Sequence, residues 1–265
     1  MYPYEIFLGM DLYTILFAVG VILCMVFIRL QSDWRGLRAG LQNLFLFNTI
    51  AAVVLGYGCA VLLQAFYNFM AGGRFEITES TGATFYGGLI GGTVLFIVIY
   101  FVVGHFLFKD KYHKSHLRTA SDIAPACICI AHGFGRLGCL MAGCCYGAKC
   151  DAWYCIEMVN LGYKVVPVQL FEAIYLIGLS IVFLLLFKKG KKYLMPVYMI
   201  AYALWRFVAE ILRNDYRGET VVDFLTPSQF VSVLLLAGGL ILWAVELYVD
   251  GKKEKNIPAE GETHE

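Results

Sequence analysis

The chain has 265 residues, of which 60% are hydrophobic and only 15% are charged, and its mean hydropathy is +0.69. This composition excludes a soluble globular protein and is typical of a protein that crosses a membrane several times. The net charge of +1 gives no sign of nucleic-acid binding, so no nucleic-acid partner is expected.

Apolar segments follow one another along the chain. A helix needs about 20 residues to cross the hydrocarbon core, and a few polar residues are tolerated against protein neighbours. We therefore predict an all-α, polytopic bundle of about seven transmembrane helices, in one domain over residues 1–250, with a polar, disordered tail at 251–265. The charge-free runs are 12–28, 39–73, 80–108, 123–135, 165–171 with its continuation past Glu172, 193–205 and 224–245.

The distribution of basic residues predicts the orientation of the bundle. Lysines and arginines gather in the cytoplasmic loops of membrane proteins. If the N-terminus lies outside, the inner segments hold most of them, so we predict an outer N-terminus and a cytoplasmic C-terminus. These basic residues are Arg29, Arg35, Arg38, Lys109, Lys111, Lys114, Arg118, Lys188, Lys189, Lys191, Lys192, Lys252, Lys253 and Lys255.

Two features lie at the outer ends of the first and third predicted helices. Tyr13 stands near the start of the first, where a tyrosine is more often an interfacial residue than a ligand contact. The third opens with Tyr86 and a glycine-rich run that includes Gly87 and Gly88. Such glycines allow close helix packing, and at an outer helix start their N–H groups can also face a lipid phosphate.

A single arginine, Arg136, stands inside the apolar stretch HGFGRLGCLMAGCCYG at residues 132–147. An arginine in hydrocarbon costs from about 3 kcal/mol upward, so such a residue indicates a functional site with an anionic partner. Its planar fork of donors suits a phosphate or a carboxylate, and a neighbouring glycine such as Gly138 lets a lipid headgroup approach the backbone. The alternative is that Arg136 pairs with an acidic residue on another helix and only fixes packing.

Charged residues also stand at the outer ends of later helices. Glu172 lies early in the fifth, where a structural role beside an arginine and a catalytic role are both open. Arg206, Glu210 and Arg213 are spaced i, i+4 and i+7, which places them on one helical face. Two arginines against one carboxylate leave spare positive charge. The predicted orientation brings these residues and Arg136 to the outer leaflet, and it therefore predicts an arginine-lined cavity for a phospholipid headgroup.

With these residues in place, the chain resembles the prolipoprotein diacylglyceryl transferases, bacterial membrane enzymes that modify the lipobox cysteine of prolipoproteins. The resemblance covers most of the chain and includes a layout of seven spans with an outer N-terminus. The matching stretches are GRLG at 135–138 followed by Gly143 and Gly147, DIAPA at 122–126, GGLIG at 87–91, QLFE at 169–172, and Arg206-Phe207 with Glu210 and Arg213.

The resemblance implies that phosphatidylglycerol donates its diacylglyceryl group to the prolipoprotein thiol, which forms a thioether and releases glycerol phosphate. The reaction belongs to the outer face of the bacterial cytoplasmic membrane and needs no cofactor. Arg136 would clamp the lipid phosphate, and Arg206 and Glu210 would support substrate binding and departure of the leaving group. The expected substrate-binding residues are Tyr13, Gly87, Gly88, Arg136, Gly138, Glu172 and Arg213.

The chain departs from the family pattern at the expected base. The family histidine before Gly-Gly is Tyr86 here, and two asparagines and a glutamate correspond to Cys139, Ala142 and Cys144. A tyrosine with a pKa near 10 is a poor base unless a nearby cation lowers that pKa. His132, one helical turn before the arginine, is a substitute, and a merely hydrogen-bonded histidine is the alternative. The catalytic candidates are Tyr86, His132, Arg206 and Glu210.

The cysteines are concentrated in the middle of the chain, and those from Cys139 onward are expected to face outward, where disulfides can persist. One or two local disulfides are expected among Cys144, Cys145, Cys150 and Cys155. No metal is assigned, because the spacing lacks the Cys-X2-Cys pairs of structural zinc, although a metal site is the second alternative and a redox or thiol-transfer role the third.

Two other functions stay open at this point. A paralogue that transfers a lipid group to another acceptor would keep the lipid pocket without the usual base. A non-enzymatic membrane carrier of thiols or metals would depend on Cys144 and Cys145 and would survive the loss of Arg206.

Overall fold

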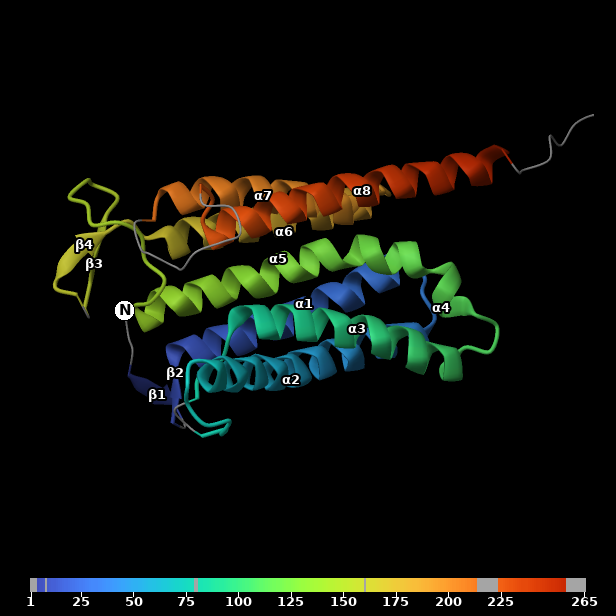
Figure 1. The fold of residues 1–265 in the computed structure, drawn as a ribbon. Coiled ribbons are helices and arrows are strands. Elements are labelled where there is room, and N and C mark those ends of the chain that lie inside the picture. The colour runs from blue at the N-terminus through green and yellow to red at the C-terminus, as the bar shows by residue number, and fades with distance from the viewer. Residues whose placement is uncertain (1–3, 8, 79–80, 160, 214–223, 256–265) are drawn as a thin grey trace, which may run out of the picture. The chain divides into compact units, whose positions relative to one another are not determined.

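The computed structural model describes residues 4–7, 9–78, 81–159, 161–213 and 224–255. Its described residues include seven helices that are long and apolar enough to cross a membrane, which confirms the predicted fold class (Figure 1). The candidate spans are Leu12–Trp34, Ala39–Met70, Gly87–Leu107, Leu117–Ala142, Val168–Lys188, Leu194–Ile211 and Pro227–Lys252. The direction in which they cross the membrane stays a prediction.

The chain divides into two compact units. The small unit is Met25–Ala120, and the large unit combines Met1–Cys24 with Ser121–Glu265. Helices α1 (Leu12–Trp34) and α5 (Leu117–Ala142) each contribute residues to both units. The single domain over residues 1–250 stays a prediction.

The small unit is built on two helices that pack closely through small residues. A Cβ added to Gly56 would lie 3.1 Å from the Cα of Gly92, so the backbones of the two helices come into contact there. Asn48 Nδ2 also donates a hydrogen bond to the carbonyl of Phe96 at 2.8 Å. Small residues and interhelical amide bonds are a usual means of helix association in lipid. The complete elements of this unit are α2 (Ala39–Met70), α3 (Phe85–Leu107) and α4 (Tyr112–Ser115).

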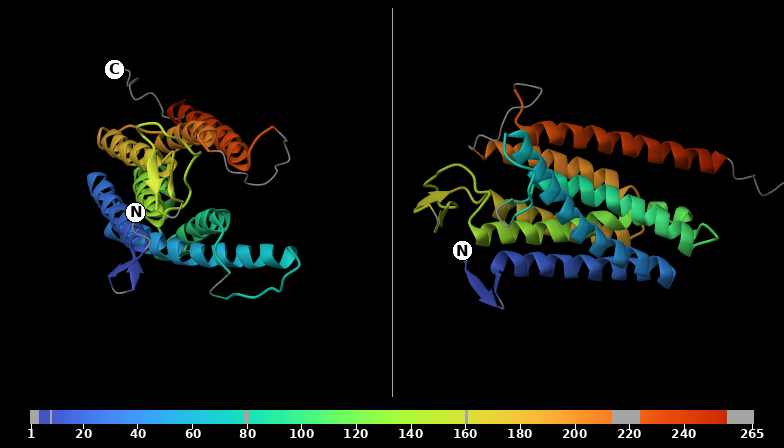
Figure 2. Two further views of the ribbon diagram at one scale, coloured as in Figure 1. Left: turned by 90° about the vertical axis from the view of Figure 1, so that its left-hand side faces the viewer. Right: turned by 60° about the horizontal axis from the view of Figure 1, so that its bottom comes forward.

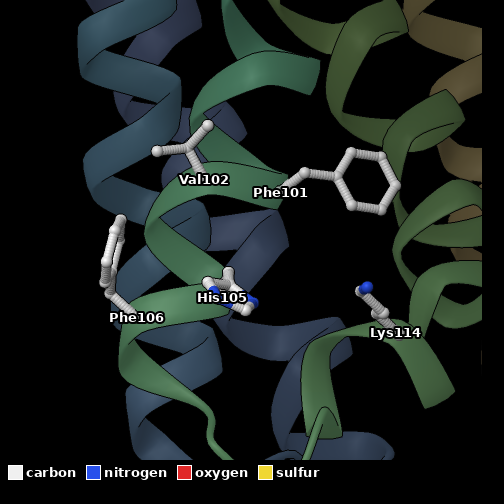
Figure 3. Close-up of a pocket in the computed structure, with 5 residues that line it drawn as sticks. All are labelled: Phe101, Val102, His105, Phe106 and Lys114. Carbon is white, nitrogen blue, oxygen red and sulfur yellow. The ribbon is translucent and has the colours of Figure 1, made fainter.

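The small unit also contains an apolar cavity of about 320 Å³ at the end of α3 (Figure 3). Its lining offers one imidazole and one ammonium group and is otherwise apolar. None of the residues that the sequence singles out for substrate binding or catalysis lines it. The lining residues are Phe101, Val102, His105, Phe106 and Lys114.

The large unit adds two short antiparallel hairpins to its helices. Glu157 faces Lys164 across the second hairpin. Helices α7 and α8 run side by side (Figures 1 and 2). Besides its parts of α1 and α5, this unit comprises β1 (Glu5–Phe7), β2 (Met10–Asp11), β3 (Ile156–Met158), β4 (Tyr163–Val165), α6 (Val168–Lys188), α7 (Leu194–Ile211) and α8 (Pro227–Lys255).

The segment between α5 and α6 is tied to the end of α7. The amide of Gly147 donates to the carbonyl of Val166 at 2.8 Å, and the amide of Ala148 donates to the carbonyl of Leu212 at 3.2 Å. Cys150 and Cys155 are joined by a disulfide with a Cα–Cα distance of 6.2 Å. These bonds fix the turn that follows α5 against the helix that carries Arg206 and Glu210.

Several helices extend beyond the charge-free runs from which they are predicted. α1 continues to Trp34 past Arg29, whose Nε lies 3.5 Å from Asp33 Oδ2 one turn further on. α5 runs from Leu117 through Pro125 to Ala142. Charged residues paired along a helix do not end it, so charge alone sets the boundaries too narrowly. α8 reaches Lys255, and residues 256–265 of the predicted tail lie outside the described residues.

Candidate functional site

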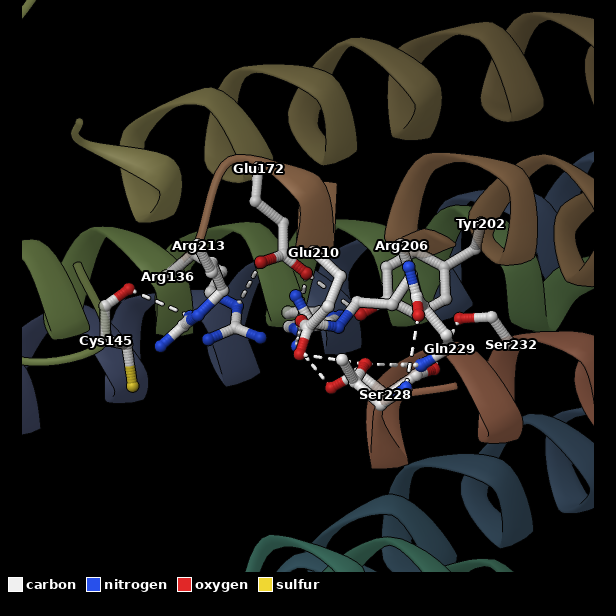
Figure 4. Close-up of polar contacts among 12 residues, drawn as sticks. Arg136, Cys145, Glu172, Tyr202, Arg206, Glu210, Arg213, Ser228, Gln229 and Ser232 are labelled. Atoms are coloured by element: carbon white, nitrogen blue, oxygen red, sulfur yellow. Dashed lines mark hydrogen bonds and ion pairs between the residues drawn. The ribbon is translucent and has the colours of Figure 1, made fainter. Parts of the chain in front are cut away.

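Arg136 and Glu172 form a buried ion pair inside the large unit (Figure 4). Arg136 Nε on α5 lies 2.8 Å from Glu172 Oε2 on α6, and the two side chains are 14% and 1% exposed. Either charge alone would be costly at this position, so each offsets the desolvation of the other. This contact uses Nε of Arg136, and the guanidinium group has two further nitrogens, Nη1 and Nη2, that can donate hydrogen bonds.

Side chains from two neighbouring helices, α5 and α7, contact the carboxylate of Glu172. His132 lies one turn before Arg136 on α5, and its Nε2 is 3.9 Å from Glu172 Oε1, within ion-pair range but too long for a hydrogen bond. Tyr202 on α7 donates its hydroxyl to the same oxygen at 2.9 Å. The rings of His132 and Tyr202 meet edge to face with centroids 5.4 Å apart. Glu172 is therefore positioned by an arginine, a tyrosine and a histidine at once.

Arg206 and Glu210 form a second ion pair one helical turn apart on α7. Arg206 Nη2 lies 3.0 Å from Glu210 Oε2, and the side chains are 12% and 4% exposed. Arg206 also donates to Ser228 Oγ at 2.8 Å, and Thr226 Oγ1 donates to Glu210 Oε1 at 3.3 Å. Nη1 of Arg206 is buried without a hydrogen-bond partner in the part of the chain that the structure describes. This nitrogen is a donor available to a bound anion.

Two side chains hold the cysteine-rich turn after α5 in place. Arg213, just beyond α7, donates from Nη1 to the carbonyl of Cys145 at 3.0 Å. Gln169, on the first turn of α6, donates from Nε2 to the carbonyl of Cys144 at 2.9 Å. The third arginine of the predicted site is thus placed beside the cysteines (Figure 4).

The thiols in this turn differ in acidity. The neighbouring thiols of Cys139 and Cys144, together with the charges of Arg136 and Arg213, hold the pKa of Cys145 well below its ordinary value. Sγ of Cys144 itself donates to the carbonyl of Cys139 at 3.6 Å. The neighbouring thiols of Cys139 and Cys145 raise the pKa of Cys144. The negative charge of the cluster therefore resides first on Cys145, close to the arginines.

Alkylation of the two neighbouring thiols is expected to depend differently on pH. A lowered pKa keeps Cys145 as thiolate at acidic pH, so its rate with iodoacetamide should stay nearly flat between about pH 6 and pH 8. A raised pKa leaves Cys144 protonated, so its rate should rise about tenfold per pH unit. Peptide mass spectrometry of the intact, reduced protein measures both rates. Equal pH profiles for the two thiols would contradict this assignment.

Gly138 allows α1 to pack directly on α5. A Cβ at this position would lie 2.9 Å from Tyr13 Cδ2 and 3.3 Å from the carbonyl oxygen of Tyr13. Gly135, on the preceding turn of α5, has no such neighbour within 4 Å. Tyr13 and Gly138, which the sequence predicts as lipid contacts, therefore also contact each other.

Replacing Gly138 with alanine is expected to destabilise the protein by about 1–3 kcal/mol, because Tyr13 must move to make room. Gly135→Ala is the matched control on the same helix, and it should be neutral or stabilising by up to about 1 kcal/mol because alanine favours the helix. Thermal unfolding in detergent micelles compares the two variants. An equal loss of stability in both would contradict the proposed close approach.

Comparison with known proteins identifies the family of this chain. The family model described as prolipoprotein diacylglyceryl transferase matches residues 4–245. The chain belongs to this family. It is 33% identical over 266 residues to phosphatidylglycerol–prolipoprotein diacylglyceryl transferase 2 of Clostridium perfringens, with 94% of this chain and 96% of the relative covered. It is 30% identical to the corresponding transferase of Clostridioides difficile, covering 95% of this chain and 96% of the relative. The protein is therefore a multi-pass membrane transferase, as the resemblance predicts.

The structure of this transferase gathers most of the predicted polar residues in the large unit. Tyr202, which donates to Glu172, stands one turn before Arg206 on α7, and this places the two ion pairs in one cluster. Gly87 and Gly88 belong to α3 of the small unit, where a Cβ on Gly87 would lie 2.8 Å from the carbonyl oxygen of Cys59. The side chain of Tyr86 lies outside the described residues. The residues gathered in the large unit are His132, Arg136, Glu172, Arg206, Glu210 and Arg213.

Tyr202 and Ser228 are among the polar residues of the transferase site that the sequence does not single out. Tyr202 stands four residues before Arg206, so the same i, i+4 spacing that joins Arg206 to Glu210 could have placed it on the polar face of α7. Ser228 receives a hydrogen bond from Arg206, and only its position at the start of an apolar helix marks it in the sequence.

Proposed function

We propose that this transferase moves the diacylglyceryl group of phosphatidylglycerol to the lipobox cysteine of prolipoproteins and releases glycerol phosphate. The proposed reaction takes place at the outer face of the bacterial cytoplasmic membrane. In it, the thiolate sulfur attacks the glyceryl carbon, a C–S bond forms, and the C–O bond to phosphate breaks. The phosphate oxygen leaves with the electron pair, and the thiol proton passes to a base.

The observation that carries the proposal is the pair of buried arginine–carboxylate contacts in one cluster of a membrane bundle. Arg136 and Arg206 are each held by a single carboxylate, Glu172 and Glu210, at 2.8 and 3.0 Å. Guanidinium donors held in place in a region of low dielectric stabilise a phosphate that gains charge as it leaves, and they need no reorganisation during the reaction.

We assign roles to the residues on this basis. Arg136, held by Glu172 through Nε, clamps the donor phosphate with Nη1 and Nη2 of its guanidinium group. Arg206, held by Glu210, stabilises the departing glycerol phosphate. His132 takes the thiol proton, since Glu172 stabilises the imidazolium that forms. Further lipid contacts are proposed for Tyr13, Tyr86, Gly87, Gly88, Gly138 and Arg213.

The test is a reaction with purified components. The protein is incubated with phosphatidylglycerol and a lipobox peptide, and mass spectrometry looks for a diacylglyceryl thioether and for glycerol phosphate in equal amounts. A peptide with serine in place of the lipobox cysteine is the acceptor control, and phosphatidylethanolamine is the donor control. Lipid binding without either product would overturn the proposed acceptor, and it would favour a transferase with a different one.

A further inference from the structure

Three thiols meet at the end of α5, outside the two ion pairs. The Sγ atoms of Cys139, Cys144 and Cys145 all lie within 4.8 Å of one another, and all three cysteines are free. They are distinct from Cys150 and Cys155, which are joined by the disulfide. No step of the transfer reaction uses them, so the cluster requires an explanation of its own.

The way in which α5 ends brings these thiols together. Gly143 adopts a left-handed conformation with a φ of 71°, and its amide donates to the carbonyl of Leu140 at 3.2 Å. The amide of Cys144 donates to the carbonyl of Cys139 at 3.1 Å. These two bonds form a Schellman motif, in which the side chains at the positions of Cys139 and Cys144 come into contact. Cys145 follows with a φ of 61°, a conformation that is uncommon for a residue with a side chain.

The turn is held in this shape by residues outside it. Gln169 donates a hydrogen bond to the carbonyl of Cys144, and Arg213 donates one to the carbonyl of Cys145. Side chains outside the turn therefore fix the positions of both carbonyl groups. A left-handed non-glycine residue costs about 1–3 kcal/mol and persists where the surroundings fix it. The thiols are therefore gathered before any ligand arrives, which lowers the entropy cost of binding one.

We propose that Cys139, Cys144 and Cys145 form a binding site for one thiophilic metal ion of the Zn²⁺ or Cu⁺ class, with three thiolate ligands. Thiolates are soft ligands that select such ions, and three protein ligands leave a fourth tetrahedral position open to water or to another thiol. This site is separate from the proposed transfer reaction and does not depend on it.

The dimensions of the cluster suit such an ion. With a Zn–S distance of about 2.3 Å, sulfurs at three tetrahedral corners lie about 3.8 Å apart. The thiols, which lie within 4.8 Å of one another, need to move by only about 1 Å to reach this arrangement. Small rotations of three cysteine side chains supply such a shift without a change in the backbone.

Charge and access also suit a metal ion. Three thiolates around a divalent ion keep one net negative charge, and Arg213, whose Nη1 donates to the carbonyl of Cys145 at 3.0 Å, places a positive charge beside the cluster. Cys144 is exposed, which provides the path by which an ion enters. The site thus has its ligands, a compensating positive field and an entrance.

The site can be tested by titrating Cd²⁺, a spectroscopic substitute for Zn²⁺, into the reduced, chelator-treated full chain in detergent micelles. We expect one equivalent to bind with a thiolate-to-metal absorption band, and added Zn²⁺ to remove that band. Serine at Cys139, Cys144 or Cys145 should weaken binding by more than about 10-fold, since even indirect partners of a metal ligand contribute that much. Cys59→Ser, at a free and half-buried cysteine of the small unit, is the matched control.

Protection from alkylation provides a second readout that needs no variant. Bound Cd²⁺ should shield Cys139, Cys144 and Cys145 from iodoacetamide and leave Cys59 as reactive as before. The absence of a band, or a band that persists in the serine variants, would mean an adventitious ion only and would overturn the site. Failure of Cd²⁺ to protect the three thiols in the wild-type protein would overturn it as well.

Discussion

Replacing Arg136 with alanine is expected to reduce diacylglyceryl transfer by about 1,000-fold or more, which is the scale seen when a donor to a developing anion is removed. The reason is that Arg136 is held against Glu172 at 2.8 Å and is proposed to grip the donor phosphate. Arg136→Lys should recover only part of the rate, because a lysine keeps the charge but loses the rigid fork of donors. Release of glycerol phosphate from phosphatidylglycerol measures the effect.

The same substitution also affects stability, and the two effects must be separated. Removing Arg136 leaves the Glu172 carboxylate, which is 1% exposed, without its ion-pair partner, and breaking a buried pair costs about 3–5 kcal/mol. Adding Glu172→Gln removes the stranded charge, so the double variant should regain much of the lost stability. It should not regain transfer activity. A double variant that is both stable and active would contradict the proposed phosphate clamp.

A matched arginine elsewhere in the chain provides the control. Arg29 lies 3.5 Å from Asp33, and the two side chains are 51% and 53% exposed. Exposed pairs contribute about 0–1 kcal/mol, so Arg29→Ala should leave both transfer and unfolding nearly unchanged. Comparing Arg29→Ala with Arg136→Ala tests whether the loss of transfer and of stability requires a buried arginine, or follows the removal of any arginine.

The sequence is sufficient for the fold class, because apolar runs of the length of a bilayer have few alternatives to a helix. It is less informative about helix ends. The run that predicts α5 stops at Gly135 because Arg136 follows, whereas the helix continues to Ala142 since Glu172 neutralises that arginine. The partner stands 36 residues further along the chain, and no local pattern reveals it.

The contacts of the site also divide into those that spacing within one helix predicts and those that depend on how helices pack together. The i, i+4 spacing of Arg206 and Glu210 predicts a common helical face, and the structure pairs them at 3.0 Å. The contact of Tyr202 with Glu172 depends on how α6 and α7 pack, which periodicity alone does not determine. The cysteine cluster depends on left-handed residues at Gly143 and Cys145, and only the glycine signals this conformation in the sequence.

Replacing His132 with glutamine is expected to lower kcat for transfer by about 100- to 10,000-fold, the usual contribution of a general base. KM for phosphatidylglycerol should change little, because the phosphate is assigned to Arg136. Glutamine keeps a polar group near Glu172, so the fold should be maintained. The acidic limb of the pH–rate profile, which a histidine base produces when it is protonated, should disappear from the residual activity of this variant.

Two further variants decide which residue takes the proton. His105→Gln alters an exposed histidine of the small unit and should leave transfer unchanged. Tyr86→Phe removes the hydroxyl at the position of the family base, and it should cost far less than His132→Gln if the imidazole is the acceptor. Nε2 of His132 faces Glu172, so we assign the accepted proton to Nδ1. A loss of activity in Tyr86→Phe together with full activity in His132→Gln would move the role to the tyrosine, whose hydroxyl would then need a cation to lower its pKa.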